Sequence, residues 1–436
     1  MGFSATSMTG TRMRHRYIGV LLAGLGVAIG FEGAGDTAVP DFAPIGSARA
    51  QESAGNTVRP EIGKPIQAAV DLLKSKRGKD ALARVREADA VPNKTPYEAY
   101  LVERVRGQAA AAAGDASTAA RAFEATAASS AVSGAERLQF LAAAAGQYYV
   151  AKDYGRAAEL GARYFKDGGT DRAIRTVYIQ ALYLGNDFAA AGRELLRDIQ
   201  AEEQTGKTPA EDKLQLLASV YLKQHDNAGY ANALEKLVAF HPKKDYWLAV
   251  VHGVGTRSGF SERLALDFAR LKLATGTMRT ATEYVEAAQL SLQVGFPAEA
   301  KKIIDQGYAA GLLGAGPESD RHGRLRDMTV KSLAEDKKTL GQDDTQAAAA
   351  KDGTVLINAG LNYVLNGRAE KGLEMMEQGL RKGGLKRPDD ARLHLGYAYH
   401  LAGQNQKAMQ VLKATQGADG TAALARLWVI HLGRAS

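Results

Sequence analysis

The sequence predicts an all-α protein: a right-handed α-solenoid of about ten stacked helix pairs with a C-terminal capping helix. Only 11 prolines interrupt 436 residues, and hydrophobic residues make up 45% of the chain while aromatic residues make up only 7%. Such a composition is typical of long helices that pack through small side chains rather than of β-rich proteins. The third observation is a repeat of about 36 residues, which is described below.

Cysteine is absent from the chain. Disulfide bridges, zinc sites built on thiolates and thiol nucleophiles are therefore excluded, and packing must stabilise the fold. The formal charge of +8 comes from 56 basic residues that are nearly balanced by 48 acidic ones. Because nucleic-acid-binding domains carry a stronger positive bias, we expect no nucleic-acid partner.

The first fifty residues have the pattern of an export signal. A basic stretch, Arg12–Arg16, precedes an uncharged apolar run, Tyr17–Phe31, which is shorter than the roughly 20 residues that span a bilayer. The motif Ala48-Arg49-Ala50 then matches the small-x-small pattern of a signal-peptidase site. We therefore predict that residues 1–50 are a signal peptide, cleaved between Ala50 and Gln51, and that the mature protein is periplasmic.

The stretch between the apolar run and the cleavage motif is longer than usual. An uncleaved N-terminal anchor or a buried helix is therefore the alternative to cleavage. We expect residues 51–61 to be a short flexible lead. No later segment approaches the length of a membrane span, so we expect no transmembrane segment after signal removal.

A helix–turn–helix unit recurs along the rest of the chain. In its clearest copy, apolar residues recur every three or four positions over residues 214–221 and again over 230–237, which predicts two amphipathic helices. A polar turn at residues 224–227 separates the two helices, and His241-Pro242 ends the unit.

This unit resembles the tetratricopeptide repeat, a helix–turn–helix of about 34 residues. In that family, small residues at two consensus positions let the paired helices approach closely. The small position of the second helix recurs here at a spacing of about 36 residues, with one gap of twice that length and one oversized tyrosine. These positions are Ala81, Ala119, Ala157, Ala191, Tyr230, Ala265, Ala300, Gly372 and Ala408.

The gap divides the predicted array into three parts. About seven units fill residues 62–316, and residues 317–352 form a degenerate, charged helical unit with a polar connector. Residues 353–436 hold further units and the capping helix. We expect the part around Arg321 to be a hinge or a loosely packed unit. Residues 420–434 are the expected capping helix, since a stack cannot bury its own end.

No catalytic or ligand-binding pattern accompanies the repeats. The eight histidines are scattered, and no His-Glu-x-x-His spacing places two imidazoles on one helical face. Gly206-Lys207-Thr208 resembles the end of a phosphate-binding loop but lacks the earlier glycine and the preceding strand. We expect no enzyme activity, no cofactor and no metal ion, although folding can assemble carboxylate pairs that a sequence does not reveal.

The resemblance implies that the first helices of successive units line a concave groove that binds a partner. The positions that face this groove in the family carry polar, aromatic or basic residues here. They are Arg104, Gln108, Tyr149, Gln180, Tyr183, Lys223, Gln289, Tyr397 and His400. Glutamine amides bond an extended peptide backbone, and tyrosine rings give contact area at small entropic cost. A merely solvated helix face has the same composition, which is the alternative.

These features together predict a non-enzymatic periplasmic scaffold that binds a partner polypeptide. The sequence is similar to exported tetratricopeptide proteins of proteobacteria, some of them associated with the TonB energy-transducing system. That similarity implies an accessory role in an envelope complex of this kind. The alternative is a helper in export or processing of cell-surface polysaccharide, which carboxylates and stacked aromatic rings in the groove would favour. The sequence does not indicate the oligomeric state.

Replacement of Gly396 by leucine tests the repeat register. Gly396 occupies the small position of the first helix in the last complete unit. A branched side chain there should force the two helices apart and destabilise the fold by roughly 1–3 kcal/mol or more. Thermal unfolding followed by circular dichroism measures the effect, and an unchanged melting temperature would contradict the register.

Overall fold

The computed structural model describes residues 57–342 and 344–433. The predicted signal peptide, its cleavage site and most of the flexible lead lie outside the described residues. Within them the chain forms α-helices and one short 3-10 helix, and no β-strand. The prediction of an all-α solenoid is confirmed, while the hand of its superhelix stays a prediction. The chain divides into two compact units, unit 1 up to Asp226 and unit 2 from Asn227.

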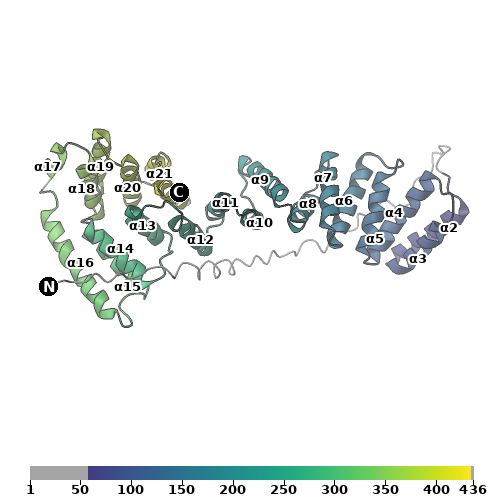
Figure 1. The fold of residues 1–436 in the computed structure, drawn as a ribbon, viewed down its shortest axis with the longest axis horizontal. Coiled ribbons are helices and arrows are strands. Elements are labelled where there is room, and N and C mark those ends of the chain that lie inside the picture. Colours follow the sequence, from purple (N-terminus) through teal and green to yellow (C-terminus); the bar gives the residue numbers. More distant parts are fainter. Residues whose placement is uncertain (1–56, 343, 434–436) are drawn as a thin grey trace, which may run out of the picture. The chain divides into compact units, whose positions relative to one another are not determined.

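Unit 1 is a row of helix pairs that stack in sequence order (Figure 1). Each pair consists of two helices joined by a short turn, and each pair packs on the next. The helices are α2 (Pro60–Lys74), α3 (Gly78–Asp89), α4 (Pro96–Ala112), α5 (Ala116–Ala128), α6 (Gly134–Val150), α7 (Tyr154–Lys166), α8 (Arg172–Leu184), α9 (Phe188–Gln204) and α10 (Glu211–Lys223).

Unit 2 contains further helix pairs and one longer helix, α16, of 21 residues. Its elements are α11 (Asn227–Phe240), α12 (Lys244–Gly255), the 3-10 helix η1 (Glu262–Leu264), α13 (Ala265–Ala274), α14 (Ala281–Gln293), α15 (Pro297–Ala309), α16 (Ser319–Thr339), α17 (Asp344–Ala349), α18 (Thr354–Leu365), α19 (Ala369–Lys382), α20 (Pro388–Leu401), α21 (Asn405–Lys413) and α22 (Thr421–Leu432). The charged segment after residue 317 is α16, which packs on α15 and α14.

The division by sequence placed its boundaries after residues 316 and 352, whereas the compact units meet between Asp226 and Asn227. This junction lies in the polar turn of the repeat that is clearest in the sequence. The composition of the turn does not distinguish it from the turns inside other pairs.

Three of the turns within the pairs of unit 1, those before α5, α7 and α9, share one local design. The N-cap residue of the second helix is an aspartate, whose side chain accepts a hydrogen bond from a backbone N–H of that helix. The residue directly before this aspartate has a positive φ. The residue pairs are Gly114 and Asp115, Lys152 and Asp153, and Asn186 and Asp187. A left-handed residue ends one helix and a side-chain cap begins the next, which allows the chain to reverse within a few residues.

Small side chains bring the two helices of a pair together, as predicted. The alanines at the second-helix position are fully buried, namely Ala81, Ala119, Ala157, Ala191, Ala300 and Ala408. Tyr230 and Ala265 are only half-buried. A Cβ atom added at Gly107 would lie 2.5 Å from the Phe123 ring, and one at Gly396 would lie 2.5 Å from Leu412 Cγ. These glycines are therefore required by close packing.

The α18/α19 pair has the closest backbone contact of this kind. A Cβ atom at Gly360 would lie 2.5 Å from the carbonyl oxygen of Gly372. One at Gly379 would lie 2.8 Å from the carbonyl oxygen of Gly353. Because a backbone cannot rotate away as a side chain can, no larger residue fits between these two helices.

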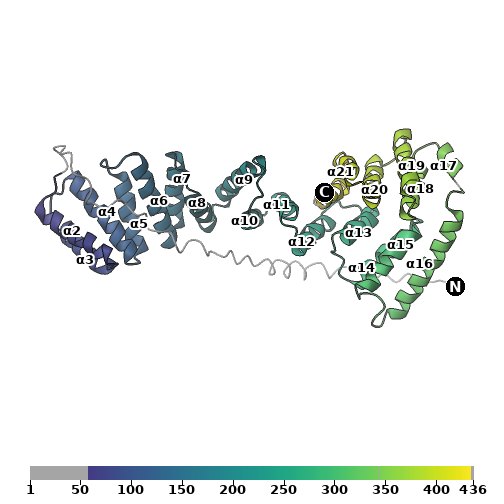
Figure 2. The ribbon, with the colours of Figure 1, turned by 180° about the vertical axis from the view of Figure 1, so that it is seen from behind.

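The two ends of unit 2 meet (Figures 1 and 2). Helix α22 is the predicted capping helix, and its Leu424, Leu427 and Trp428 are buried. It covers α20 and α21 as expected, but it also packs against α11 and α13 at the start of the unit. The backbone N–H of Ser261 donates to the carbonyl of Asp419 at 2.9 Å. The chain of unit 2 therefore folds back on itself.

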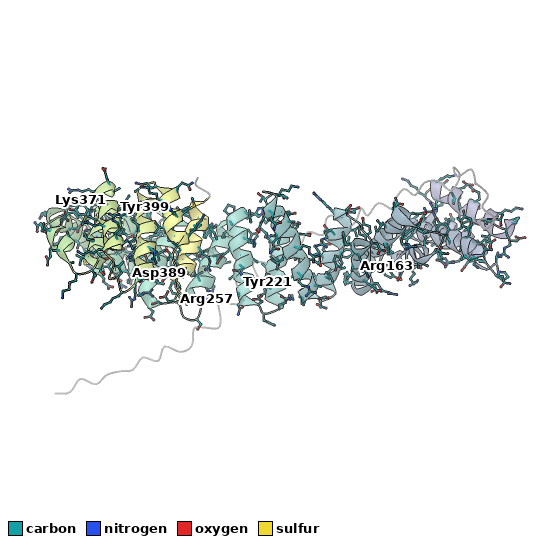
Figure 3. The ribbon with its side chains drawn as sticks, turned by 90° about the horizontal axis from the view of Figure 1, so that it is seen from above. Arg163, Tyr221, Arg257, Lys371, Asp389 and Tyr399 are labelled. Carbon is teal, nitrogen blue, oxygen red and sulfur yellow. The ribbon has the colours of Figure 1, made fainter. Side chains whose placement is uncertain are left out.

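The helix pairs of unit 2 expose two different edges (Figure 3). Tyr399, near the end of α20, and Lys371, near the start of α19, lie on the edge where pairs turn. Asp389, at the start of α20, lies on the opposite edge. None of the helices within the described residues is both long enough and apolar enough to cross a membrane.

Replacement of Gly360 by alanine should destabilise unit 2 by about 1–3 kcal/mol, because the new methyl group would press on the Gly372 carbonyl. Gly323, within α16, is the matched control, since a Cβ atom there would meet nothing within 4 Å. Gly323→Ala should stabilise the protein by roughly 0.5–1 kcal/mol through helix propensity. Urea unfolding of both variants measures the difference, and equal effects would contradict the contact.

Candidate functional site

The nine predicted groove residues separate into two groups. Six lie on first helices of unit 1: Arg104 and Gln108 on α4, Tyr149 on α6, Gln180 and Tyr183 on α8, and Lys223 at the end of α10. Three lie in unit 2: Gln289 on α14, and Tyr397 and His400 on α20.

The residues of unit 1 form a surface that we call the first-helix face. On α4, α8 and α10 they are three residues apart, which places them on one side of the helix, and on α6 Tyr149 lies two turns after Ala142 with Val150 next to it. All are exposed or half-buried. The first-helix face comprises Gln108 and Ala111 on α4, Ala142, Tyr149 and Val150 on α6, Gln180 and Tyr183 on α8, and Ser219 and Leu222 on α10.

Aromatic pairs hold the tyrosines of this face in place. The ring of Tyr149 meets that of Tyr154 edge to face at 5.8 Å between centroids, and Tyr183 meets Phe188 in the same way at 5.5 Å. The Tyr183 hydroxyl lies 2.7 Å from the Ser219 hydroxyl and so links α8 to α10. Burial raises the pKa of Tyr149 above its usual value, so its hydroxyl stays protonated and neutral.

Two apolar side chains on this face are unusually exposed. Val150 is 47% exposed at the end of α6, and Leu222 is 41% exposed on α10. Single exposed apolar residues are common on any surface. Val150 follows Tyr149 in the chain, and Leu222 lies three residues after Ser219 on α10. The face therefore offers amides, hydroxyls and apolar contact area.

Basic side chains on the first helices of unit 1 pair with acids of neighbouring helices. Arg104 is only 14% exposed, and its Nη1 lies 3.2 Å from Glu136 Oε1 on α6 and 2.8 Å from the Tyr100 hydroxyl. Arg175 on α8 lies 2.9 Å from Asp198 on α9. The guanidinium of Arg104 is thus occupied within unit 1, and its predicted role in meeting a partner carboxylate would require it to leave Glu136.

Tyr397 and His400 face the interior of unit 2. The Tyr397 hydroxyl donates to Glu299 Oε1 at 3.0 Å, and its ring lies 5.6 Å from that of Trp428. The His400 ring lies 5.3 Å from Trp428. Gln289 is half-buried on α14. Tyr397 and His400 therefore make contacts within unit 2.

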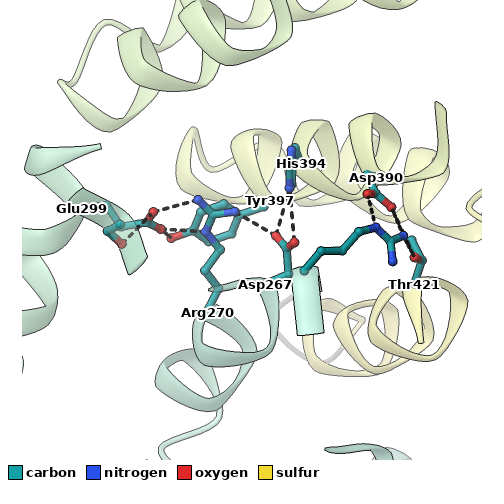
Figure 4. Close-up of polar contacts among 9 residues, drawn as sticks. Asp267, Arg270, Glu299, Asp390, His394, Tyr397 and Thr421 are labelled. Carbon is teal, nitrogen blue, oxygen red and sulfur yellow. Dashed lines mark hydrogen bonds and ion pairs between the residues drawn. The ribbon is translucent and has the colours of Figure 1, made fainter. Parts of the chain in front are cut away.

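A buried charged network surrounds Tyr397 (Figure 4). The guanidinium of Arg270 on α13 makes two bonds to Glu299 of α15, from Nε to Oε1 at 2.8 Å and from Nη2 to Oε2 at 2.7 Å. Its Nη1 donates to Asp267 Oδ1 at 2.8 Å. The side chains of all three residues are at most 7% exposed. Such bidentate, desolvated ion pairs are geometrically specific.

Helix α20 completes this network with Tyr397, 98 residues after its partner Glu299, and His394, 127 residues after its partner Asp267. The Tyr397 ring lies under the Arg270 guanidinium, 4.8 Å from its carbon to the ring centroid. His394 Nε2 lies 3.2 Å from an oxygen of Asp267. We call Asp267, Arg270, Glu299, His394 and Tyr397 the α13–α20 network.

The network keeps Asp267 and Arg270 ionised. Burial alone would raise the pKa of Asp267, but His394 and Arg270 outweigh it and hold that pKa at about 2. Burial opposes the charge of Arg270, yet Glu299 and Asp267 raise its pKa above the usual value. Burial and the neighbouring Glu299 raise the pKa of Tyr397 well above its usual value, so Tyr397 acts as a neutral donor.

A second, more exposed set of contacts flanks this network (Figure 4). Arg263 Nη2 lies 2.7 Å from Asp390 Oδ1 on α20 and 2.7 Å from Asp419 before α22. Arg426 on α22 lies 3.2 Å from Glu235 on α11. We call these the rim pairs. They join the same two ends of unit 2 as the α13–α20 network does.

Sequence reasoning missed the α13–α20 network. Its signals in the sequence are weak. Asp267 and Arg270 are three residues apart, a spacing that also occurs in many exposed ion pairs on single helices. Glu299 is a single acidic residue next to Ala300, which is predicted to pack between helices. The burial of these charges depends on α20 arriving from far along the chain. Within the described residues, no three His, Asp or Glu side chains are placed to hold a metal ion.

No family model matches the sequence, and comparison with curated proteins gives no match. Solved structures give weak similarity. The Naa15/Naa10 complex bound to HypK-THB is 14% identical over 82% of this chain and 58% of that one, with a TM-score of 0.29. The pentatricopeptide repeat protein PPR10 from maize is 14% identical over 83% of this chain and 60% of that one, with a TM-score of 0.28. Yeast Tom70 is 10% identical over 86% of this chain and 96% of that one, with a TM-score of 0.22.

The chain thus spans about three fifths of the first two of these structures. At such identities and TM-scores the similarity does not bear on function. The helix pairs themselves define this chain as a helical-repeat protein, since they stack through small residues at a regular spacing.

Replacement of Arg270 by methionine should destabilise unit 2 by roughly 3–5 kcal/mol, because Asp267 and Glu299 would stay buried without their cation. Arg175→Met in unit 1 is the matched control, since its partners Glu194 and Asp198 are 15% and 22% exposed and water can solvate them. Chemical denaturation of both variants measures the two losses. A loss no greater for Arg270→Met than for Arg175→Met would contradict the structural role of the network.

Proposed function

We propose that this protein is a non-enzymatic scaffold of the cell envelope that holds an extended polypeptide segment on the first-helix face of unit 1. The observation that carries the proposal is the chemistry of that face. Glutamine amides at Gln108 and Gln180 and hydroxyls at Tyr183 and Ser219 alternate with apolar contact area at Val150 and Leu222. Amides and hydroxyls both donate and accept, as an extended backbone requires.

The partner segment has few charges in this proposal. Arg104 and Arg175 are paired with acids inside unit 1, so the face presents little charge for a partner to complement. Lys223, exposed at the end of α10, is the exception. Affinity then depends on backbone hydrogen bonds and apolar contacts, and salt should weaken it little.

The arrangement of the aromatic rings favours a polypeptide over a polysaccharide. Sugars stack on free aromatic faces, whereas Tyr149 and Tyr183 each make edge-to-face contact with a neighbouring ring. The first-helix face as defined also lacks the carboxylates that would bond sugar hydroxyls. A helper in polysaccharide export or processing is therefore the second candidate.

The proposed compartment is the periplasm. It is supported by the order of basic, apolar and small-x-small segments in the first fifty residues. Within the envelope, we extend the proposal to an accessory role in an energy-coupling complex of the TonB type. The support for this step is the resemblance in sequence to exported tetratricopeptide proteins.

Site-specific photo-crosslinking tests the proposed face. A photoreactive phenylalanine replaces Gln180 in the full chain, expressed in cells with its own leader. We expect a covalent adduct with a partner polypeptide in the periplasmic fraction. The matched control is the same group at Arg163 on the second helix α7, whose side chain is 47% exposed (Figure 3). The control should give no adduct.

Identification of the adduct decides between the candidates. An energy-coupling protein of the inner membrane would support the TonB-type role, and a polysaccharide synthase or export protein would support the second candidate. Equal adducts from positions 180 and 163 would overturn the proposed face. Recovery of the protein only from the cytosol would overturn the proposed compartment.

A further inference from the structure

The start and the end of unit 2 are held together by charged contacts. The α13–α20 network and the rim pairs both cross between helices α11–α15 and helices α20–α22. The residues in these contacts are separated by as many as 191 positions in the sequence. Regular stacking of neighbouring pairs does not need such contacts, because each pair is already covered by the next.

Two apolar clusters of unit 2 lie outside this closing contact, which itself also buries Trp247 and Trp428. One hydrophobic cluster joins α13 to α16 and includes Ile303, Ile304 and Leu325. Another joins α17 to α19 and includes Leu356 and Tyr363. Each cluster is built from helices that follow one another in the chain, so each can persist when the two ends of the unit separate.

The chemistry of the closing contact makes separation reversible. Burying an ion pair costs a desolvation penalty that nearly cancels its attraction, so charged groups that separate regain hydration. The rim pairs are partly hydrated even in the closed form: Arg263 is 21% exposed and Arg426 is 53% exposed. An interface that combines partly hydrated ion pairs with a few buried apolar side chains, among them Trp247 and Trp428, resembles the contacts between domains that move.

We propose that the charged contacts form a latch, and that unit 2 opens and closes at the contact between α11–α13 and α20–α22. In the closed form, Tyr397 and His400 on α20 are half-buried against Trp428 on α22. Opening uncovers this aromatic surface and hydrates Asp267, Arg270 and Glu299. The latch is a property of unit 2 and does not depend on a partner bound to unit 1.

Distance measurements between two spin labels test the latch directly. The chain has no cysteine, so Asp245→Cys on α12 and Gln410→Cys on α21 introduce the only two thiols. Both positions are exposed, and they lie on opposite sides of the closing contact. We expect two distance populations, a short one for the closed form and a longer one for the open form.

Removal of a rim pair should shift the two populations. Arg263→Gln takes away the contacts to Asp390 and Asp419 and should enlarge the long-distance population severalfold. Arg175→Gln in unit 1 removes an ion pair of similar exposure and should leave the populations unchanged. Arg426→Gln, which breaks the contact to Glu235, provides a second opening variant if Arg263→Gln does not fold.

Intrinsic fluorescence gives an independent measurement on the unlabelled protein. The chain has only two tryptophans, and both lie at the closing contact: Trp247 is 4% exposed and its ring lies 5.9 Å from that of His431, and Trp428 is 2% exposed. Acrylamide quenching should therefore rise in Arg263→Gln and not in Arg175→Gln. A single distance population that Arg263→Gln and Arg426→Gln leave unchanged, with unchanged quenching, would overturn the latch.

Discussion

Close contact between the two backbones of a helix pair is the constraint on which the rest of the structure depends. Where Gly360 meets Gly372, or Gly107 meets the Phe123 ring, even one added methyl group has no space. The buried alanines play the same part in the other pairs. Once the small residues occupy the contact within a pair, the larger apolar side chains lie on its flanks, where the neighbouring pairs cover them. Stacking then follows from the pairing.

This constraint also decides where charges can go. The inner side of each pair is filled by small and apolar residues, so arginines on first helices reach sideways to acids of adjacent helices, as Arg104 reaches Glu136 and Arg175 reaches Asp198. The first-helix face of unit 1 is left with amides, hydroxyls and tyrosines. A face with little charge and with packed aromatic side chains suits an extended segment of low charge, since few tightly hydrated groups have to be desolvated on binding.

Unit 2 uses the same helix pairs for a different purpose. Its ends meet, so Tyr397, which stands at a position that usually faces a groove, is half-buried and bonded to Glu299. Charged and polar contacts set the geometry at this point. The bidentate contact of Arg270 with Glu299 fixes the orientation of α13 relative to α15. The bonds of His394 to Asp267 and of Tyr397 to Glu299 fix α20 against these two helices. The two units therefore share a repeat but differ in what their first helices contact.

The sequence by itself determined the all-α class, the helix pairs, the small residues between them and the capping helix around Trp428. The helices follow from apolar spacings of three and four residues, and the pairs follow from a repeat of about 36 residues, both of which can be seen in the sequence. Only the tertiary structure decided that Arg104 is paired with Glu136, that Tyr397 is bonded to Glu299, and that Arg270 lies between Asp267 and Glu299. The contacts of Tyr397 depend on how far unit 2 curves before its ends meet. That curvature is the sum of small rotations between successive pairs, and no single residue encodes it.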